Sequence, residues 1–272
     1  MPGRVFRVLS PKCATRSRNR VLSTVVATAR SIAAYVLVLL YVLVASPIGI
    51  VVTLIIRRSH FLYWLGRQGC RIGLTTAGIR YRVTGQERLR REQATVYCVN
   101  HASNIEPPII YMALAAVHPR LRILYKAEIH RIPVLSTVFD IAGFVPIQRR
   151  SREQSRKAID IAAAGLREGN SFLVFPEGTR SRTGELLPFK KGGFVMAIRG
   201  RSAIVPLVIL GSHDAMRKGS PIIRSVTISV RIGESLASAD YGLERRDDLS
   251  RETRARMEAL IAKGPVGPRD ES

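Results

Sequence analysis

Residues 94–117, ATVYCVNHASNIEPPIIYMALAAV, contain the pattern that decides the fold. The first six are apolar or β-branched, which is typical of a short strand buried on both faces. A polar segment follows at once, and Pro107 and Pro108 open a second apolar stretch. Because proline is favoured in the first turn of a helix, the sequence predicts a buried strand at 94–99, a turn, and a helix at 108–117.

The same alternation of strand and helix patterns continues towards the C-terminus. Further strands are predicted at 79–84, 122–125, 144–147, 171–175, 203–210 and 226–232, and further helices at 132–142, 152–168 and 192–199. Such alternation predicts an α/β fold, a mixed and mostly parallel sheet flanked by helices. We assign this domain to residues 78–240, and residues 241–272 to a charged C-terminal helix and tail.

The charge of the chain points to an anionic partner. Of 272 residues, 43 are Lys or Arg and 20 are Asp or Glu, which gives a net charge of +23. Nucleic acid and anionic lipid are the two partners that such a field attracts. The hydrophobic content of 46% excludes general disorder. Three cysteines without paired spacing exclude a disulfide scaffold and a cysteine zinc site, and they fit a reducing compartment.

The N-terminal segment, residues 1–77, is predicted to be a basic, hydrophobic helical module that attaches to a membrane. No Asp or Glu precedes Glu87, and the 25 residues at 32–56 carry no charge. About 20 apolar residues can cross a bilayer core. Pro47 interrupts the run, so we expect two half-length helices that enter the bilayer and return. Basic residues on both sides favour this arrangement, with both ends on the cytoplasmic face. The alternatives are a single span and a buried helix pair of a soluble protein.

Residues 61–82 continue this module with apolar residues between arginines. Tyr63 and Trp64 are of the type that lies at the depth of lipid headgroups. The pattern predicts an amphipathic helix at the membrane interface. A surface helix packed against the second domain explains it equally well.

The polar turn after the first strand contains a candidate general base. His101 and Glu106 are five residues apart, so on a regular helix they would point roughly 140° away from each other. They can meet only if the chain turns between them, which a strand end followed by proline allows. A carboxylate that orients a histidine then gives a base that works near neutral pH. Alternatively, Glu106 stabilises only the helix N-terminus and His101 is a loop residue.

A second polar segment, FPEGTRS at 175–181, also follows a predicted strand. It combines an acid, a glycine suited to a tight turn and an arginine. Ligands of open α/β sheets bind at the carboxyl ends of the strands. The alternative is an exposed turn with a surface ion pair.

Together these segments resemble the lysophosphatidate (1-acylglycerol-3-phosphate) acyltransferase family, bacterial type, within the glycerolipid acyltransferase superfamily. The first block is Asn100-His101 with the acid at Glu106, and the third is FPEGTRS. Between them lies a second block, and after them a Phe-Lys-x-Gly segment and a fourth block: Lys126-Ala127-Glu128-Ile129 with Pro133, Gly143 and Arg149; Phe189, Lys190 and Gly192; and Val205-Pro206-Leu207-Val208. The hydrophobic N-terminus also looks like the helix pair of bacterial members.

The resemblance implies acyl transfer from a thioester, acyl-CoA or acyl-carrier protein, to the free hydroxyl of a lysophospholipid in phospholipid biosynthesis. His101 would deprotonate that hydroxyl and Glu106 would orient His101, with no covalent intermediate. Substrate contacts are implied for the other matched positions: Asn100, Lys126, Arg149, Glu177, Gly178, Thr179, Arg180 and Lys190, of which Lys126, Arg149, Arg180 and Lys190 are candidate phosphate ligands. We expect no metal or cofactor, a membrane bilayer as partner, and a catalytic domain on the cytoplasmic side of the cell membrane.

The family carries Asp where this chain has Glu106. The longer side chain leaves other acceptors open: glycerol 3-phosphate, a headgroup lysophospholipid or a glycolipid. A membrane-tethered nucleic-acid-binding protein is a more remote alternative. No nucleic acid partner is expected, because no recognition motif is present and the basic residues lie beside an apolar anchor.

Overall fold

A computed structural model describes residues 11–148 and 150–267. Among these residues one sheet has eight strands, in the order β1-β7-β6-β2-β5-β3-β4, with β8 paired to β6. The strands are β1 (Arg80–Thr84), β2 (Thr95–Val99), β3 (Leu121–Lys126), β4 (Val145–Ile147), β5 (Ser171–Val174), β6 (Ala203–Leu210), β7 (Thr227–Ile232) and β8 (Leu236–Ala237). The helices are α1 (Pro11–Ile56), α2 (His60–Ala77), α3 (Glu106–Ala113), α4 (Pro133–Ile141), α5 (Arg152–Arg167), α6 (Gly192–Gly200), α7 (Ser212–Ala215) and α8 (Arg246–Ala262).

The prediction of a mixed, mostly parallel sheet is confirmed. β2 lies at the centre, parallel to both β5 and β6, with Cys98 opposite Val174 on one side and Pro206 on the other. β3 and β4 extend the parallel part, whereas β7 and β8 run antiparallel to β6. The carboxyl ends of β2, β5 and β6 therefore meet at one edge of the sheet.

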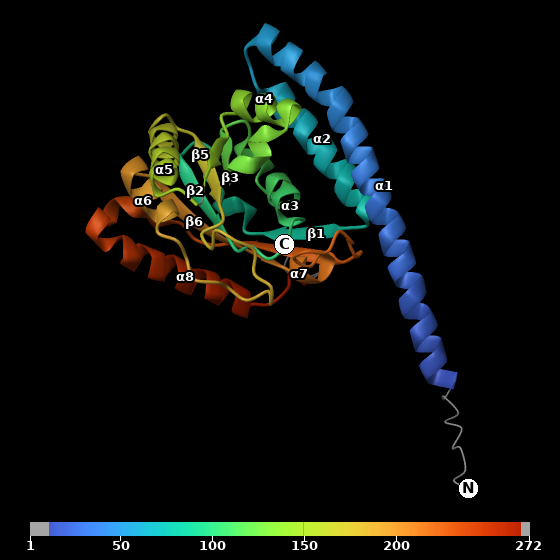
Figure 1. Cartoon of the computed structure of the whole chain (residues 1–272). Helices are drawn as coiled ribbons and strands as arrows, with labels where there is room; N and C mark the ends of the chain where they lie inside the picture. Colours follow the sequence, from blue (N-terminus) through green and yellow to red (C-terminus); the bar gives the residue numbers. More distant parts are fainter. Residues whose placement is uncertain (1–10, 149, 268–272) are drawn as a thin grey trace.

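Side chains of β2 alternate between two apolar layers. Tyr97 and Val99 belong to the layer that includes Ile109 of α3. Val96 and Cys98 belong to the opposite layer, with residues of α5 and α6 such as Ala162 and Phe194. The two helix layers on either side of the sheet are visible in Figure 1. This double burial explains why the strand reads as a continuous apolar run.

The expected break at Pro47 is wrong, because α1 continues through it as one helix from Pro11 to Ile56. The chain turns only after the apolar run, at Arg57, whose φ is +55°. Pro47 removes one helical hydrogen bond, and neighbouring helices can compensate for such a loss. Here α2 packs against this part of α1, since Gly49 lies against the side chains of Leu62 and Leu65. The pair of helices is thus α1 and α2, not two halves of α1.

Most of the residues of α1 between 22 and 56 are exposed. The stretch Leu22–Ile56 is long and apolar enough to cross a membrane, with a mean hydropathy of 2.6. Of its most apolar 18 residues, 17% are buried. The residues that it does bury are small, such as Ala34, Ala45 and Gly49. Figure 1 shows α1 extending well beyond the α/β domain.

The helix α2 packs against the α/β domain and ends at Gly78. Tyr63 is buried, and its hydroxyl donates to the Leu121 carbonyl at 2.5 Å. Gly78 ends the helix with a φ of +74° and donates its N–H to the last turn. Trp64 is 45% exposed. One face of α2 therefore lies on the domain, as one of the two alternatives predicted, and Trp64 is turned outward. The headgroup position expected for Tyr63 is wrong, because its ring is buried against the domain.

Candidate functional site

His101 and Glu106 meet at the carboxyl end of β2. The chain turns after Val99, and α3 begins at Glu106, two residues earlier than predicted. His101 Nδ1 lies 2.6 Å from Glu106 Oε2. The turn that the sequence required is therefore present, and it places the imidazole and the carboxylate in direct contact.

The Glu106 carboxylate has no exposed surface, yet both of its oxygens are well supplied with donors. Oε1 accepts from the main-chain N–H of Ala102 at 2.9 Å and of Ser103 at 3.0 Å, and from Ser212 Oγ at 2.6 Å. Since this carboxylate accepts hydrogen bonds from all of its other partners, Oε2 also accepts one from a proton-bearing Nδ1 of His101. Nε2 is then left as the basic nitrogen.

The FPEGTRS segment holds the main chain of His101 from both sides. Glu177 Oε1 accepts the His101 N–H at 2.6 Å, and the Ser181 N–H donates to the His101 carbonyl at 2.7 Å. The imidazole stacks on Phe175, with ring centroids 4.1 Å apart. The two segments singled out in the sequence thus form one rigid unit.

Glu177 is buried, with 2% of its surface exposed. Its second oxygen, Oε2, accepts the Leu187 N–H at 3.0 Å. Burial raises the pKa of Glu177 to about 7, the N–H groups of Leu187 and His101 oppose that shift, and the nearby Glu106 adds to it. Both oxygens contact the main chain, so Glu177 positions His101 and the following loop and does not face the cavity.

A cavity of about 620 Å³ opens beside His101. Its far walls are apolar and come from α2, α3, β3 and α4, including Leu62, Ile123 and Phe139. Its near end is polar and basic, and is lined by His101, Asn104, Lys126, Thr179, Arg180 and Lys218. An apolar space that ends at a base and three cations suits an amphiphile with an anionic head.

A second, apolar cavity of about 440 Å³ lies between α1, α2 and α4. It shares Cys70, Asn104 and Pro108 with the first cavity. The space beside His101 therefore borders on the N-terminal helices.

Only some of the predicted substrate residues line this cavity. His101, Lys126, Thr179 and Arg180 line it. Lys126 also forms an ion pair with Glu128, Nζ to Oε1, at 3.2 Å. Arg149 lies outside the described residues.

Gly178 and Lys190 contact each other instead. Gly178 has a φ of +68°, and a Cβ there would come within 2.8 Å of the Lys190 side chain. The Lys190 N–H donates to the Pro176 carbonyl at 2.7 Å. The glycine thus allows both the turn and the close passage of the lysine stem.

Asn100 is buried, and its side chain forms hydrogen bonds to the main chain of β6. Its Nδ2 donates to the Ile209 carbonyl at 3.0 Å, and its Oδ1 accepts the Ile209 N–H at 2.7 Å. Both ends of the amide are therefore occupied by β6. We predicted a substrate contact for Asn100, whereas its side chain contacts the neighbouring strand.

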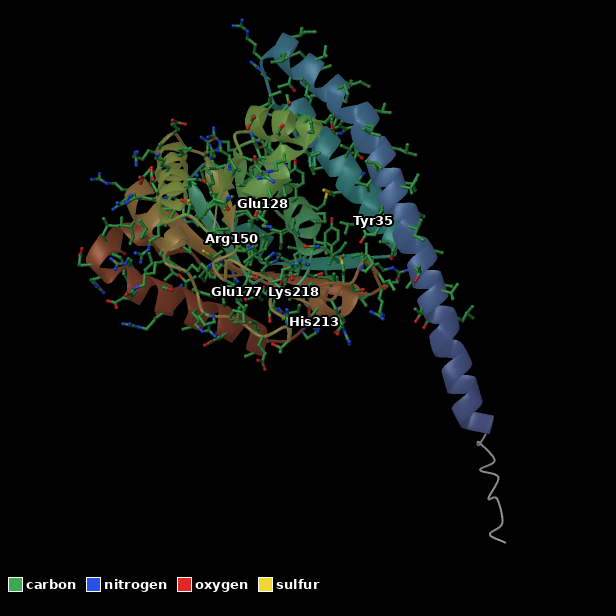
Figure 2. All side chains as sticks on the ribbon, in the orientation of Figure 1. Tyr35, Glu128, Arg150, Glu177, His213 and Lys218 are labelled. Atoms are coloured by element: carbon green, nitrogen blue, oxygen red, sulfur yellow. The ribbon has the colours of Figure 1, made fainter. Side chains whose placement is uncertain are left out.

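The sequence predicted no site residue in the segment 211–226, which follows β6. Ser212 supplies the hydroxyl that binds Glu106, and Lys218 Nζ donates to the Arg180 carbonyl at 2.7 Å. Figure 2 shows Lys218 and Glu177 at the same end of the sheet. The sequence contained one indirect signal for this segment. Because β6 is parallel to β2, the chain that follows β6 emerges at the same edge of the sheet as His101.

Among the side chains that the structure describes, those of residues 22–148 and 150–267, no group of three His, Cys, Asp or Glu is arranged to hold a metal ion. The described part of the site consists of an imidazole, carboxylates, cations and an apolar space. Cys98, close to His101 in sequence, is buried in the core, and burial raises the pKa of its thiol to about 12.

Known proteins resemble this chain in sequence and in fold. The family model "Acyltransferase" matches residues 80–210. A 1-acyl-sn-glycerol-3-phosphate acyltransferase of Limnanthes douglasii is 33% identical over 172 residues, 63% of this chain and 59% of that protein. One of Borreliella burgdorferi is also 33% identical, over 60% of this chain and 63% of that protein. The chain therefore matches about three-fifths of the length of each of these relatives.

The crystal structure of the 1-acyl-sn-glycerophosphate (LPA) acyltransferase, PlsC, from Thermotoga maritima has the same fold. The TM-score is 0.76 at 19% identity, with 90% of this chain and 99% of that one covered. The matched segment runs from β1 to the end of β6 and contains both halves of the site, His101 with Glu106 and the FPEGTRS turn. Residues 80–210 of this chain thus form a domain of the acyltransferase family.

Proposed function

We propose that this protein transfers a fatty acyl group from a thioester donor to the free hydroxyl of 1-acylglycerol 3-phosphate, which yields phosphatidic acid. The observation that carries the proposal is the place of His101, oriented by Glu106 at 2.6 Å, where an apolar cavity meets a basic mouth. The relatives are 1-acyl-sn-glycerol-3-phosphate acyltransferases, and their activity supports the same reaction. We propose acyl-CoA or acyl-carrier protein as the donor and phospholipid biosynthesis as the context.

The proton moves through Nε2 of His101. Glu106 binds the Nδ1–H, so Nε2 is free to take the proton of the acceptor hydroxyl. The hydroxyl oxygen attacks the thioester carbonyl carbon as the proton leaves. Glu106 stabilises the imidazolium that forms, as a triad carboxylate does.

The tetrahedral intermediate then collapses without any covalent bond to the protein. The C–S bond breaks, the thiol leaves with the proton from His101, and the ester remains on the acceptor. The main chain of His101 is held at both its N–H and its carbonyl. The imidazole therefore keeps its position through both proton transfers, which is what general base and then general acid catalysis requires.

The basic mouth fits the acceptor phosphate. Arg180 and Lys126 line the cavity near His101. A guanidinium can bind two phosphate oxygens at once, and an ammonium acts as a point charge. A phosphate held there would leave the glycerol hydroxyl near the imidazole and the acyl chain towards the apolar walls.

We further propose that α1 and α2 attach the protein to the membrane that contains its acceptor, with the catalytic domain on the cytoplasmic face. The exposed apolar surface of Leu22–Ile56 supports this, as do Arg57 and Arg58 beside it. Single cysteines at position 22 and position 58, in a variant without the native cysteines, test the orientation in sealed vesicles. We expect labelling from the same side, and labelling from opposite sides would instead mean one span.

The reaction is tested with the purified full chain and palmitoyl- or oleoyl-CoA. Lysophosphatidate, glycerol 3-phosphate, lysophosphatidylcholine and a lysoglycolipid are offered in parallel, with acyl-carrier protein as the second donor. We expect phosphatidic acid as the main product. Faster acylation of another acceptor would replace the proposed substrate, and no transfer with any pair would contradict the activity.

A further inference from the structure

The segment 211–226, between β6 and β7, is tied to the site at several points. Ser212 Oγ donates to Glu106 Oε1 at 2.6 Å, and Ser103 Oγ donates to the Met216 carbonyl at 2.7 Å. The same segment is bound to α1, because the Ile223 N–H donates to Ser31 Oγ at 2.8 Å. The chain on both sides of Lys218 is therefore fixed, and Lys218 projects from a held backbone.

Lys218 reaches the turn that presents Arg180. Its Nζ donates to the Arg180 carbonyl at 2.7 Å and to Thr179 Oγ1 at 3.3 Å. Both acceptors are neutral. In the part of the chain that the structure describes, Lys218 has no carboxylate partner. An ammonium has three N–H donors, so one remains unoccupied.

Lys218 also lines the cavity that holds His101, Thr179 and Arg180. The carboxylates that contact the turn at His101 are occupied: Glu106 by His101 and main-chain donors, and Glu177 by two N–H groups. A half-buried ammonium without a counter-ion favours an incoming anion, because desolvating an unpaired charge is costly. Arg180, which lines the same cavity, adds to that preference.

We propose that Lys218 is a phosphate-binding residue of this site: it holds the Thr179–Arg180 turn and gives its third N–H to a phosphate monoester, the head of the acceptor. The inference deepens the proposed function and rests on it for the identity of the acceptor. It adds a cation from outside the FPEGTRS segment, on a part of the chain that follows the matched family domain.

The test compares four variants of the full chain in detergent micelles. Lys218→Met removes all donors, Lys218→Gln keeps an amide donor without the charge, and Lys218→Arg keeps the charge. Arg217→Met is the matched control, since Arg217 is the exposed neighbour and loses the same charge. Steady-state KM and kcat are measured for lysophosphatidate and for acyl-CoA separately, because acyl-CoA also carries phosphates.

Loss of a hydrogen bond to a charged group corresponds to roughly a 10- to 150-fold effect. We expect Lys218→Met and Lys218→Gln to lower kcat/KM for lysophosphatidate by that factor, mainly through KM. Lys218→Arg should recover most of it, and Arg217→Met should stay within about twofold of wild type. KM for acyl-CoA should change little, and a larger change there would assign Lys218 to the donor phosphates and overturn the proposal.

Equilibrium binding separates this inference from the proposed function. Binding of lysophosphatidate and of 1-acylglycerol, which lacks the phosphate, is measured for wild type, Lys218→Gln and Lys218→Met. We expect both variants to bind lysophosphatidate more weakly than wild type does, and to bind 1-acylglycerol as well as wild type does. Equal losses for both lipids would mean that Lys218 only supports the turn, which overturns the phosphate contact. A wild type that binds lysophosphatidate through Lys218 but transfers no acyl group would contradict the proposed function and leave the contact established.

Discussion

The carboxylate of Glu177 holds the main-chain N–H of His101 at 2.6 Å, although the two residues are 76 positions apart in the chain. This bond joins the turn after β2 to the turn after β5. It explains why an acid that does not face the cavity belongs to the site. The base can remove a proton efficiently only if its imidazole stays in place, and Glu177 fixes the peptide from which that imidazole projects.

Replacing His101 by Ala should abolish acyl transfer while leaving the fold intact. Loss of a general base costs about 10²- to 10⁴-fold in rate. Initial rates at saturating substrates measure the effect, and circular dichroism checks the fold. His60→Ala is the matched control, since His60 is exposed at the start of α2. Turnover of His101→Ala close to that of the control would end the proposed mechanism.

Glu177 should make folding stability depend on pH in a defined window. Its pKa is about 7 in the folded protein and 4.5 without the surrounding structure. Between these values the folded state binds more protons than the unfolded state, so the free energy of unfolding falls as pH rises. In Glu177→Gln this contribution is absent, and stability should decline less from pH 4.5 to pH 7 than in wild type.

Urea unfolding at several pH values measures this difference. Glu185→Gln, at an exposed position a few residues along the chain, is the control and should follow wild type. Glu177→Gln should also be slower in acyl transfer at pH 8, because an amide cannot accept both N–H groups with its two ends. Parallel pH profiles for wild type and Glu177→Gln would show that this carboxyl titrates at an ordinary pKa.

Glu106→Asp should be less active than wild type, even though Asp is the usual residue of the family. Glu106 reaches His101, two main-chain N–H groups and Ser212 from the first turn of α3. A side chain shorter by one methylene cannot keep all of these contacts on the same backbone. A buried donor left without a partner costs about 1–3 kcal/mol. Ser212→Ala is the companion variant, since it removes one of the contacts and keeps Glu106.

Kinetics and unfolding curves of both variants distinguish the two possible causes. We expect Glu106→Asp to lower kcat and stability together, and Ser212→Ala to do so to a smaller degree. An Asp variant as active as wild type would mean that the turn between residues 101 and 106 adjusts freely to the length of the acid.

The central strands β2, β5 and β6 were predictable because each lies between two apolar layers, so its sequence is a short apolar run. The sequence predicted a contact between His101 and Glu106 only if the chain turns between them. No periodicity in the sequence specifies such a turn. The extent of α1 was not, because the effect of Pro47 depends on α2, which packs against the same part of the helix.

The roles of Asn100 and Lys218 depend on partners that lie far away in the chain. Asn100 binds the main chain of Ile209, and Lys218 binds that of Arg180. Both partners are main-chain groups, which every residue has, so no residue type marks them in the sequence. The folded sheet brings each side chain to its partner, and the order of strands in that sheet is known only from the structure.

Arg180→Ala should weaken use of lysophosphatidate more than use of the acyl donor. Arg180 lines the cavity beside His101, and its main chain is held by Lys218. Removal of a charged donor to phosphate corresponds to about 1.5–3 kcal/mol, or a 10- to 150-fold loss in kcat/KM. Arg180→Lys should recover part of it, since the charge remains but the two-pronged contact is lost. Arg182→Ala, at an exposed position two residues on, is the control. An efficiency within about threefold of wild type for Arg180→Ala would favour an acceptor without a terminal phosphate.

Positive charge on the outward face of α1 should release the protein from membranes. Leu39 and Leu43 lie one helical turn apart and are 59% and 54% exposed. Burial of a leucine side chain contributes about 1.5–3 kcal/mol, which a charged lysine loses, so Leu39→Lys together with Leu43→Lys should strongly reduce co-sedimentation with uncharged phosphatidylcholine vesicles. Ile161→Lys is the matched control, because Ile161 is an equally exposed apolar residue, 59%, on α5 in the layer across the sheet from α3. Both proteins should keep the unfolding midpoint of wild type, since no buried residue changes. If the double variant sediments with vesicles as the control does, α1 does not insert through this face, and contact with the membrane must be assigned elsewhere on the molecule.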